Sequence, residues 1–212
     1  MVKLLILSIF FQSILMAHRP SFKISDRFQV VPDAIQHFSV GFKTHMASAL
    51  WLRSLQGFDY CEKEISAGVC SPKSWLYQNI NLASTLDPVF EPGFYRLGAL
   101  ALTVIISDYE GASIIFDRGV AQYPNYWPLL YSAGYHSYFE EKNLLKASQL
   151  FDRAAKNGAP EWVAVLAGRL AADGGDIGLA KQILKTMIDT NQDEKLVKRL
   201  QDKINSLTKQ NN

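Results

Sequence analysis

The feature that most constrains the fold of this chain is a repeat of about 35 residues. The pattern Ala-x3-Phe-x2-small occurs twice, at Ala112, Phe116 and Gly119 and again at Ala147, Phe151 and Ala154. In both copies apolar residues recur at intervals of three and four, which is typical of an amphipathic helix. One such unit cannot bury its own apolar face, so the period predicts a stack of helical units that pack on their neighbours.

Residues that begin and end helices recur with the same period. A capping-type residue lies four positions before each alanine, Asp108 in the first copy and Asn143 in the second, and a proline follows each copy. A glycine recurs in the stretch before each copy, at Gly98, Gly134 and Gly168. A third, weaker copy consists of Asp176, Ala180, Leu184 and Met187. The small residues predict close contacts between helix backbones, and the two phenylalanines are expected to fill the space between units.

This pattern resembles the tetratricopeptide repeat over roughly residues 75–190. The resemblance implies an all-α fold, a right-handed α-solenoid of helix-turn-helix repeats with a C-terminal capping helix. An ordinary helical bundle with coincidental spacing is the alternative. The whole chain also resembles exported bacterial tetratricopeptide proteins of unassigned function, so the resemblance brings no activity with it.

Four segments are expected along the chain: 1–17, 18–73, 74–190 and 191–212. The second is an N-terminal helical segment, broken near Gly41, with Met46, Leu50 and Leu55 as candidate core residues. It is expected to supply the first helix of an incomplete repeat whose second helix is residues 74–86. The last segment is an amphipathic capping helix in which leucines and one isoleucine form a stripe.

The first segment has the character of a signal peptide. Lys3 precedes a run of mostly apolar residues that ends at Ala17 and, as a helix, is about 21 Å long, shorter than the roughly 30 Å hydrocarbon core of a bilayer. Cleavage after Ala17 predicts export to the periplasm or cell envelope. If the segment is not cleaved, it becomes an inner-membrane anchor.

The two cysteines, Cys61 and Cys70, flank a short loop-like stretch. In an oxidising compartment they are expected to form a disulfide. Two free thiols are the alternative for a cytosolic protein. Nine residues apart and without a nearby histidine, they do not make a metal site.

No catalytic or cofactor motif is found in the sequence. The formal net charge of +2 gives no electrostatic footprint for nucleic acid. The four histidines are far apart or lie on different expected faces, and no phosphate loop or nucleophile elbow occurs. The acidic pair Glu140-Glu141, the acidic residues from Asp173 to Asp176, and Gly174-Gly175 are interpreted as helix ends and turns. The sequence therefore predicts that the protein is not an enzyme and has no cofactor or metal.

Aromatic residues are concentrated between 123 and 139. In tetratricopeptide folds the first helix of each unit lines a concave groove, and the resemblance places Tyr131, Tyr135 and Tyr138 there, with Tyr95 one unit earlier and Arg169 one unit later. Packing between units is an equal alternative for Tyr131 and Tyr135, and Phe139 is expected in the core. Tyrosine suits binding because it combines a large rigid area with a polar tip.

These features predict a scaffold that binds a peptide or helix of an unidentified protein partner in its groove. A structural subunit that joins a membrane-associated assembly, through repeat stacking or the C-terminal helix, is the alternative. An exposed aromatic groove would favour the first, and an apolar patch on the last helix would favour the second.

Overall fold

The computed structural model describes residues 28, 30–37, 40–63 and 70–210, and their side chains except those of residues 59–63 and 210. This part of the chain is helical and contains no β-strand. After a short 3-10 helix, η2, come the α-helices α2 (Lys43–Lys63), α3 (Trp75–Leu86), α4 (Pro92–Ile106), α5 (Tyr109–Gln122), α6 (Trp127–Phe139), α7 (Leu144–Lys156), α8 (Trp162–Asp173), α9 (Ile177–Asp189) and α10 (Glu194–Gln210).

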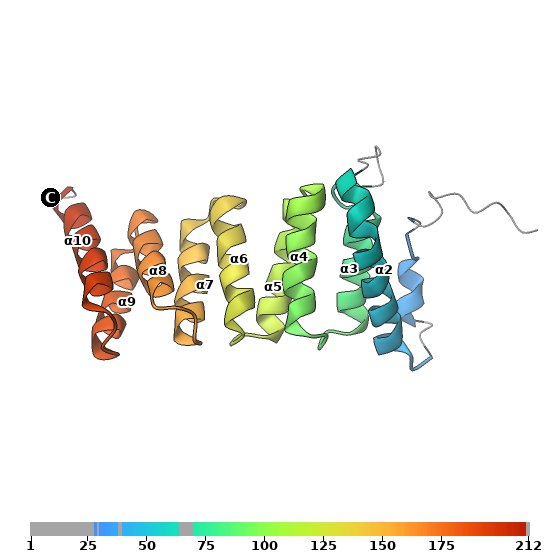
Figure 1. Ribbon diagram of the computed structural model, residues 1–212, viewed down its shortest axis with the longest axis horizontal. Helices are drawn as coiled ribbons and strands as arrows, with labels where there is room; N and C mark the ends of the chain where they lie inside the picture. The colour runs from blue at the N-terminus through green and yellow to red at the C-terminus, as the bar shows by residue number, and fades with distance from the viewer. Residues whose placement is uncertain (1–27, 29, 38–39, 64–69, 211–212) are drawn as a thin grey trace, which may run out of the picture.

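The helices stand side by side in one elongated row that follows the order of the sequence (Figure 1). Each helix packs against the next one along the chain, and α2 also packs against α4, α4 against α6, and α8 against α10. The buried apolar side chains form one cluster that extends from α2 to α10. This arrangement confirms the expected all-α fold of consecutively packed helices and is compatible with a helical repeat.

The turns before α5, α7 and α9 repeat one backbone geometry, and the turn before α3 shares it in part. A residue with positive φ precedes each of α3, α5, α7 and α9 by two positions: Lys73 (57°), Ser107 (52°), Lys142 (56°) and Gly175 (89°). The next residue is the N-cap, and in the last three turns its side chain accepts a hydrogen bond from a backbone N–H of the first helical turn. The pairs are Asp108 with Gly111 N, Asn143 with Lys146 N, and Asp176 with Leu179 N. The predicted cap residues are therefore confirmed.

The recurring glycines lie at close contacts with side chains of neighbouring helices, whereas the prediction was of contacts between helix backbones. A Cβ atom added at Gly98 would lie 3.1 Å from Ile80 of α3, one at Gly134 would lie 3.0 Å from Phe151 of α7, and one at Gly168 would lie 2.5 Å from Leu200 of α10. Each of these equivalent glycines therefore makes room for a side chain of a different neighbouring helix. Phe116 and Phe151 are both buried, and Phe116 packs against His136 of the following unit with ring centroids 5.3 Å apart.

The N-terminal helical segment is more complete than expected. The break near Gly41 is confirmed, because Gly41 has a φ of +84° and α2 begins two residues later. Helices α2 and α3 pack together as a full pair. Leu50 is buried and Met46 is partly buried against the core. The prediction for Leu55 is wrong: it is 40% exposed because it lies on the outer face of α2.

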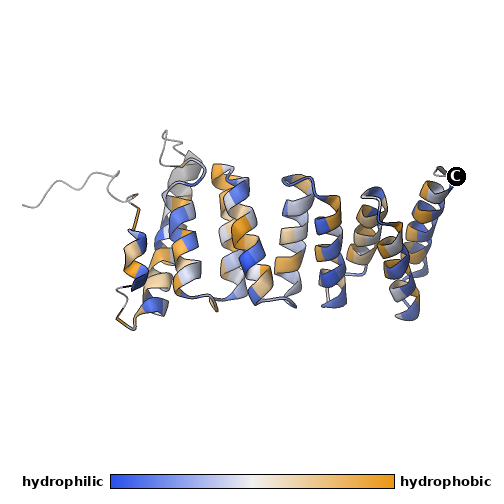
Figure 2. Ribbon diagram, turned by 180° about the vertical axis from the view of Figure 1, so that it is seen from behind, coloured by the Kyte–Doolittle hydropathy of each residue, from blue (hydrophilic) through white to orange (hydrophobic). Residues whose placement is uncertain are grey.

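Helix α10 closes the row and packs against both α8 and α9. Leu200 and Ile204 are buried, while Leu196 and Leu207 lie partly buried against the same cluster. Hydrophobic and hydrophilic residues alternate along this helix, next to the C-terminal label (Figure 2). The predicted apolar stripe is therefore confirmed.

Two predictions fall partly or wholly outside the described residues. Residues 1–17 are not described, and no helix in the described part of the chain is both long and apolar enough to cross a membrane. Cys70 is buried and no described cysteine is a free thiol, but the side chain of Cys61 is not described. The Cys61–Cys70 disulfide stays a prediction.

Candidate binding surface

Helix α6 presents a row of aromatic rings to solvent. Tyr131, Tyr135 and Phe139 are spaced by four residues, which places them on one face of the helix. Tyr135 is 50% and Phe139 40% exposed, so both are accessible to a partner. The ring centroids of Tyr135 and Phe139 lie 4.3 Å apart, and those of Tyr138 and Phe139 lie 4.5 Å apart. The prediction that Phe139 belongs to the core is wrong, because its side chain is 40% exposed.

Trp162, the first residue of α8, extends this aromatic row to the next unit. It is 46% exposed, and its ring meets that of Tyr131 edge-on at a centroid distance of 5.8 Å. Tyr131 also packs against the buried Phe151, with centroids 5.4 Å apart. Tyr131 is therefore half-buried and packs between the buried Phe151 and the exposed Trp162. We call Tyr131, Tyr135, Tyr138, Phe139 and Trp162 the aromatic face.

A groove between α8 and α10 continues from Trp162. One pocket, of about 200 Å³, is lined by Trp162, Val165, Leu166, Arg169, Leu196 and Arg199. A second pocket shares Trp162, Leu196 and Arg199 with the first and is also lined by Glu161, Asp193 and Lys195. Arg169 is exposed and lines the first pocket together with Trp162. Sequence reasoning missed Trp162 and Arg199, because their meeting depends on α10 folding back onto α8.

Tyr95 does not belong to this surface, and its assignment as a binding residue is wrong. It is fully buried, and its hydroxyl donates a hydrogen bond to the carbonyl oxygen of Pro88 at 2.7 Å. Burial raises the pKa of Tyr95 to about 12. Tyr95 can be buried because Gly119 of α5 has no Cβ atom and so leaves room for the tyrosine side chain in the core. Helix α4 exposes Leu97 and Val104 instead.

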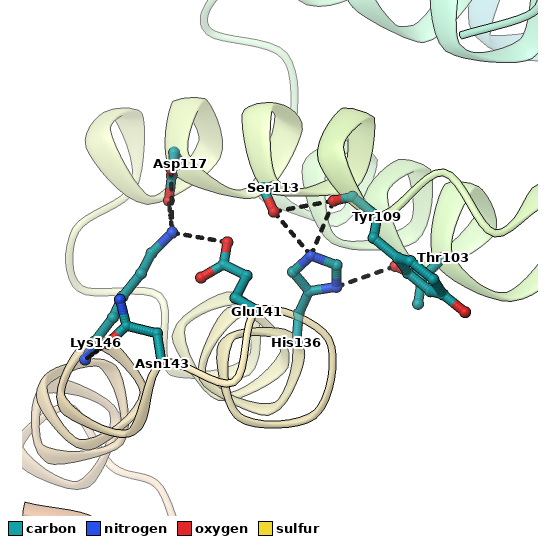
Figure 3. Close-up of polar contacts among 8 residues, drawn as sticks. All are labelled: Thr103, Tyr109, Ser113, Asp117, His136, Glu141, Asn143 and Lys146. Carbon is teal, nitrogen blue, oxygen red and sulfur yellow. Dashed lines mark hydrogen bonds and ion pairs between the residues drawn. The ribbon is translucent and has the colours of Figure 1, made fainter. Parts of the chain in front are cut away.

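A polar cluster joins α4, α5 and α6 behind the aromatic face (Figure 3). His136 is buried, with Nδ1 3.2 Å from Thr103 Oγ1 and Nε2 3.0 Å from Ser113 Oγ and 3.2 Å from the carbonyl oxygen of Tyr109. Burial lowers the pKa of His136 below its ordinary value. The contact between Ser113 and His136 is that of a nucleophile and a base. However, Nδ1 faces a hydroxyl instead of the carboxylate that orients a catalytic histidine.

Glu141 lies in the turn after α6, as expected, but its side chain is only partly exposed and forms an ion pair. Lys146 Nζ lies 3.0 Å from Glu141 Oε1 and 2.9 Å from Asp117 Oδ1, so the lysine links α5, α7 and the turn between α6 and α7 (Figure 3). Partial burial acts to raise the pKa of Glu141, but hydrogen bonds with Ser113, Lys146 and Ser137 bring the pKa below its ordinary value. The cluster therefore holds consecutive units together.

The described residues contain no group of three or more histidine, cysteine or acidic side chains that could hold a metal ion. Comparison of the chain with protein-family models, with curated proteins and with solved structures gives no match.

Proposed function

We propose that the chain is a tetratricopeptide-type right-handed α-solenoid in which α10 is the capping helix. The recurring glycines, the N-caps of α5, α7 and α9, and the positive-φ residues two positions before each second helix support this assignment. Repetition of one turn before α5, α7 and α9 supports a regular stack of helix pairs, which is the basis of a superhelix.

On this scaffold the aromatic face and the adjoining groove bind a peptide or a helix of a protein partner, without catalysis. The observation that carries the proposal is the exposure of Tyr135, Phe139 and Trp162, which lie on the first helices of two successive units. Exposed aromatic side chains of this size cost free energy in water, and a partner that covers them removes that cost. No cofactor or nucleic acid is required.

Assembly through the last helix has less support. No residue of α10 is among the large hydrophobic side chains exposed in the described part of the chain, so this helix offers no apolar patch for stacking. The exposed apolar side chains lie on other helices along the row, among them Leu97 and Val104 on α4 and Tyr135 and Phe139 on α6. Their position favours a partner along the row over a partner at its end.

Site-specific photo-crosslinking in the native cell envelope tests the proposal. A photoreactive residue at position 135 is expected to capture a partner, and the same residue at position 109 is not. Tyr109 is a suitable control because it is 44% exposed but lies on α5, away from the aromatic face. With the captured partner, Tyr135→Ala plus Phe139→Ala is expected to weaken binding by more than about 1 kcal/mol while Tyr109→Ala has no effect. Equal capture at both positions contradicts the proposal.

We also propose that the mature chain begins near His18, is exported to the periplasm or cell envelope, and carries a Cys61–Cys70 disulfide. The burial of Cys70 supports the disulfide. A bridge that closes a loop of about ten residues stabilises the fold by roughly 2–3 kcal/mol in the chain-entropy model. Thiol labelling of the unfolded, unreduced protein tests the bridge, and two labels per chain would refute it.

A further inference from the structure

The groove between α8 and α10 has two ends of different chemistry. At one end, the acidic residues are occupied by the fold itself. Glu161 Oε2 accepts a hydrogen bond from the backbone N–H of Asp193 at 3.1 Å, and Asp193 Oδ1 accepts one from the N–H of Lys195 at 2.8 Å. The first bond joins the start of α8 to the start of α10, and the second is local to the start of α10, where a negative charge is favourable for the helix dipole.

At the other end, two cations share one pocket. Arg169 of α8 and Arg199 of α10 both line the pocket of about 200 Å³. Neither guanidinium makes an ion pair or hydrogen bond with another described residue, whereas Lys146, Lys156 and Lys203 all pair with carboxylates. Two like charges at one pocket repel each other, and an anion between them removes that repulsion. The arginine fork also suits a carboxylate, which it can bind through two parallel hydrogen bonds.

The wall between the arginines and Trp162 is apolar. Val165 is almost fully buried, and Leu166 and Leu196 are partly buried against the core. Trp162 is the exposed aromatic ring at the far side of this wall. An occupant therefore needs an anionic group for the arginines and, beside it, a large apolar group for the wall and the tryptophan.

We infer that the α8–α10 groove binds a protein segment in which an aspartate or glutamate side chain lies close to a large apolar side chain. The carboxylate is held between Arg169 and Arg199, and the apolar side chain lies on Leu166, Leu196 and Trp162. This inference rests on the proposed function and specifies the chemistry of the partner.

Selection from a random peptide library, displayed as fusions that leave no free peptide C-terminus, tests the inference on the intact chain. Acidic residues next to large apolar residues are expected in the selected peptides. The best peptide is made synthetically with an amidated C-terminus. Its affinity for the double variant Arg169→Ala plus Arg199→Ala is expected to be at least about tenfold lower than its affinity for the parent chain. Its affinity for the parent chain is also expected to fall as the salt concentration is raised. Lys198→Ala is the matched control, because Lys198 is an exposed cation next to Arg199 outside both pockets.

Three results would overturn the inference. One is selected peptides without acidic residues, and another is equal binding to the parent and the double arginine variant. The third is a library that yields no binding peptide. Peptides without acidic residues that still depend on Tyr135 and Phe139 would leave the proposed function standing while the inference fails. Tighter binding by the free-acid form than by the amide would assign the arginines to a C-terminal carboxylate instead.

Discussion

At the scale of single residues, the missing Cβ atom of Gly119 allows Tyr95 of α4 to be buried in the core. A Cβ atom at this position would lie 2.5 Å from Tyr95 Cβ, a distance that packed atoms do not tolerate. Gly119→Ala is therefore expected to destabilise the protein by about 1–3 kcal/mol through overpacking. In most helices the same substitution stabilises by roughly 0.5–1 kcal/mol. The sign of the change in unfolding free energy, measured by denaturant titration, checks this.

Gly93→Ala is the control for that experiment. Gly93 lies in the first turn of α4, and an added Cβ would have no atom within 4 Å. Its substitution is expected to be neutral or stabilising. If Gly119→Ala were equally harmless, Tyr95 would have room to move, and its burial would not depend on the missing Cβ atom.

Tyr131 shows why the residues of the aromatic face are not equivalent. Its ring contacts buried Phe151 on one side and exposed Trp162 on the other. Tyr131→Ala is expected to lower both the unfolding free energy and partner binding, while Tyr135→Ala lowers binding alone. Thermal unfolding of the two variants separates these roles. Equal stability losses would mean that Tyr135 is also a packing residue.

At the scale of elements, the turn before each second helix offers a comparison within one chain. Gly175 occupies the positive-φ position before α9, while Lys142 occupies the same position before α7. A non-glycine residue in the left-handed region costs about 1–2 kcal/mol, partly offset by glycine's greater entropy loss on folding. Lys142→Gly is thus expected to stabilise, and Gly175→Ala to destabilise, each by up to about 1 kcal/mol.

Nothing else at these two positions interferes with that comparison. Lys142 is exposed, and a Cβ atom added at Gly175 has no neighbour within 4 Å. Chemical denaturation of both variants measures the effect. Changes of the same sign in both would show that the turns are not equivalent and would weaken the assignment of a common repeat.

At the scale of the whole molecule, the features that the sequence predicts best are those that recur in each repeat. The caps at Asp108, Asn143 and Asp176 depend on local geometry, so spacing alone is enough to find them. The groove could not be predicted in this way, because Trp162 and Arg199 come together only after α10 has folded onto α8. The repeat pattern wrongly predicted that Tyr95 lies in the groove. The pattern does not show that Gly119, which has no Cβ atom, leaves room for the Tyr95 side chain in the core. The contacts of His136 were not predicted because its partners come from two other helices, α4 and α5.

His136 makes the stability of the whole row depend on pH. Because burial lowers its pKa from the ordinary 6.5, the unfolded chain binds more protons than the folded chain between the lowered pKa and about pH 6.5. Unfolding free energy therefore falls as pH decreases through this window, by at most about 1.4 kcal/mol per pH unit, and the loss ends below the folded pKa. Thr103, Ser113 and the Tyr109 carbonyl hold the ring between consecutive units, so the effect belongs to global unfolding.

His136→Gln keeps a polar group there but does not titrate, and denaturation at several pH values is expected to show a flatter profile for it than for the parent. Parallel profiles for the parent and His136→Gln would place the pH dependence on other groups, and the buried cluster would then be a purely structural joint.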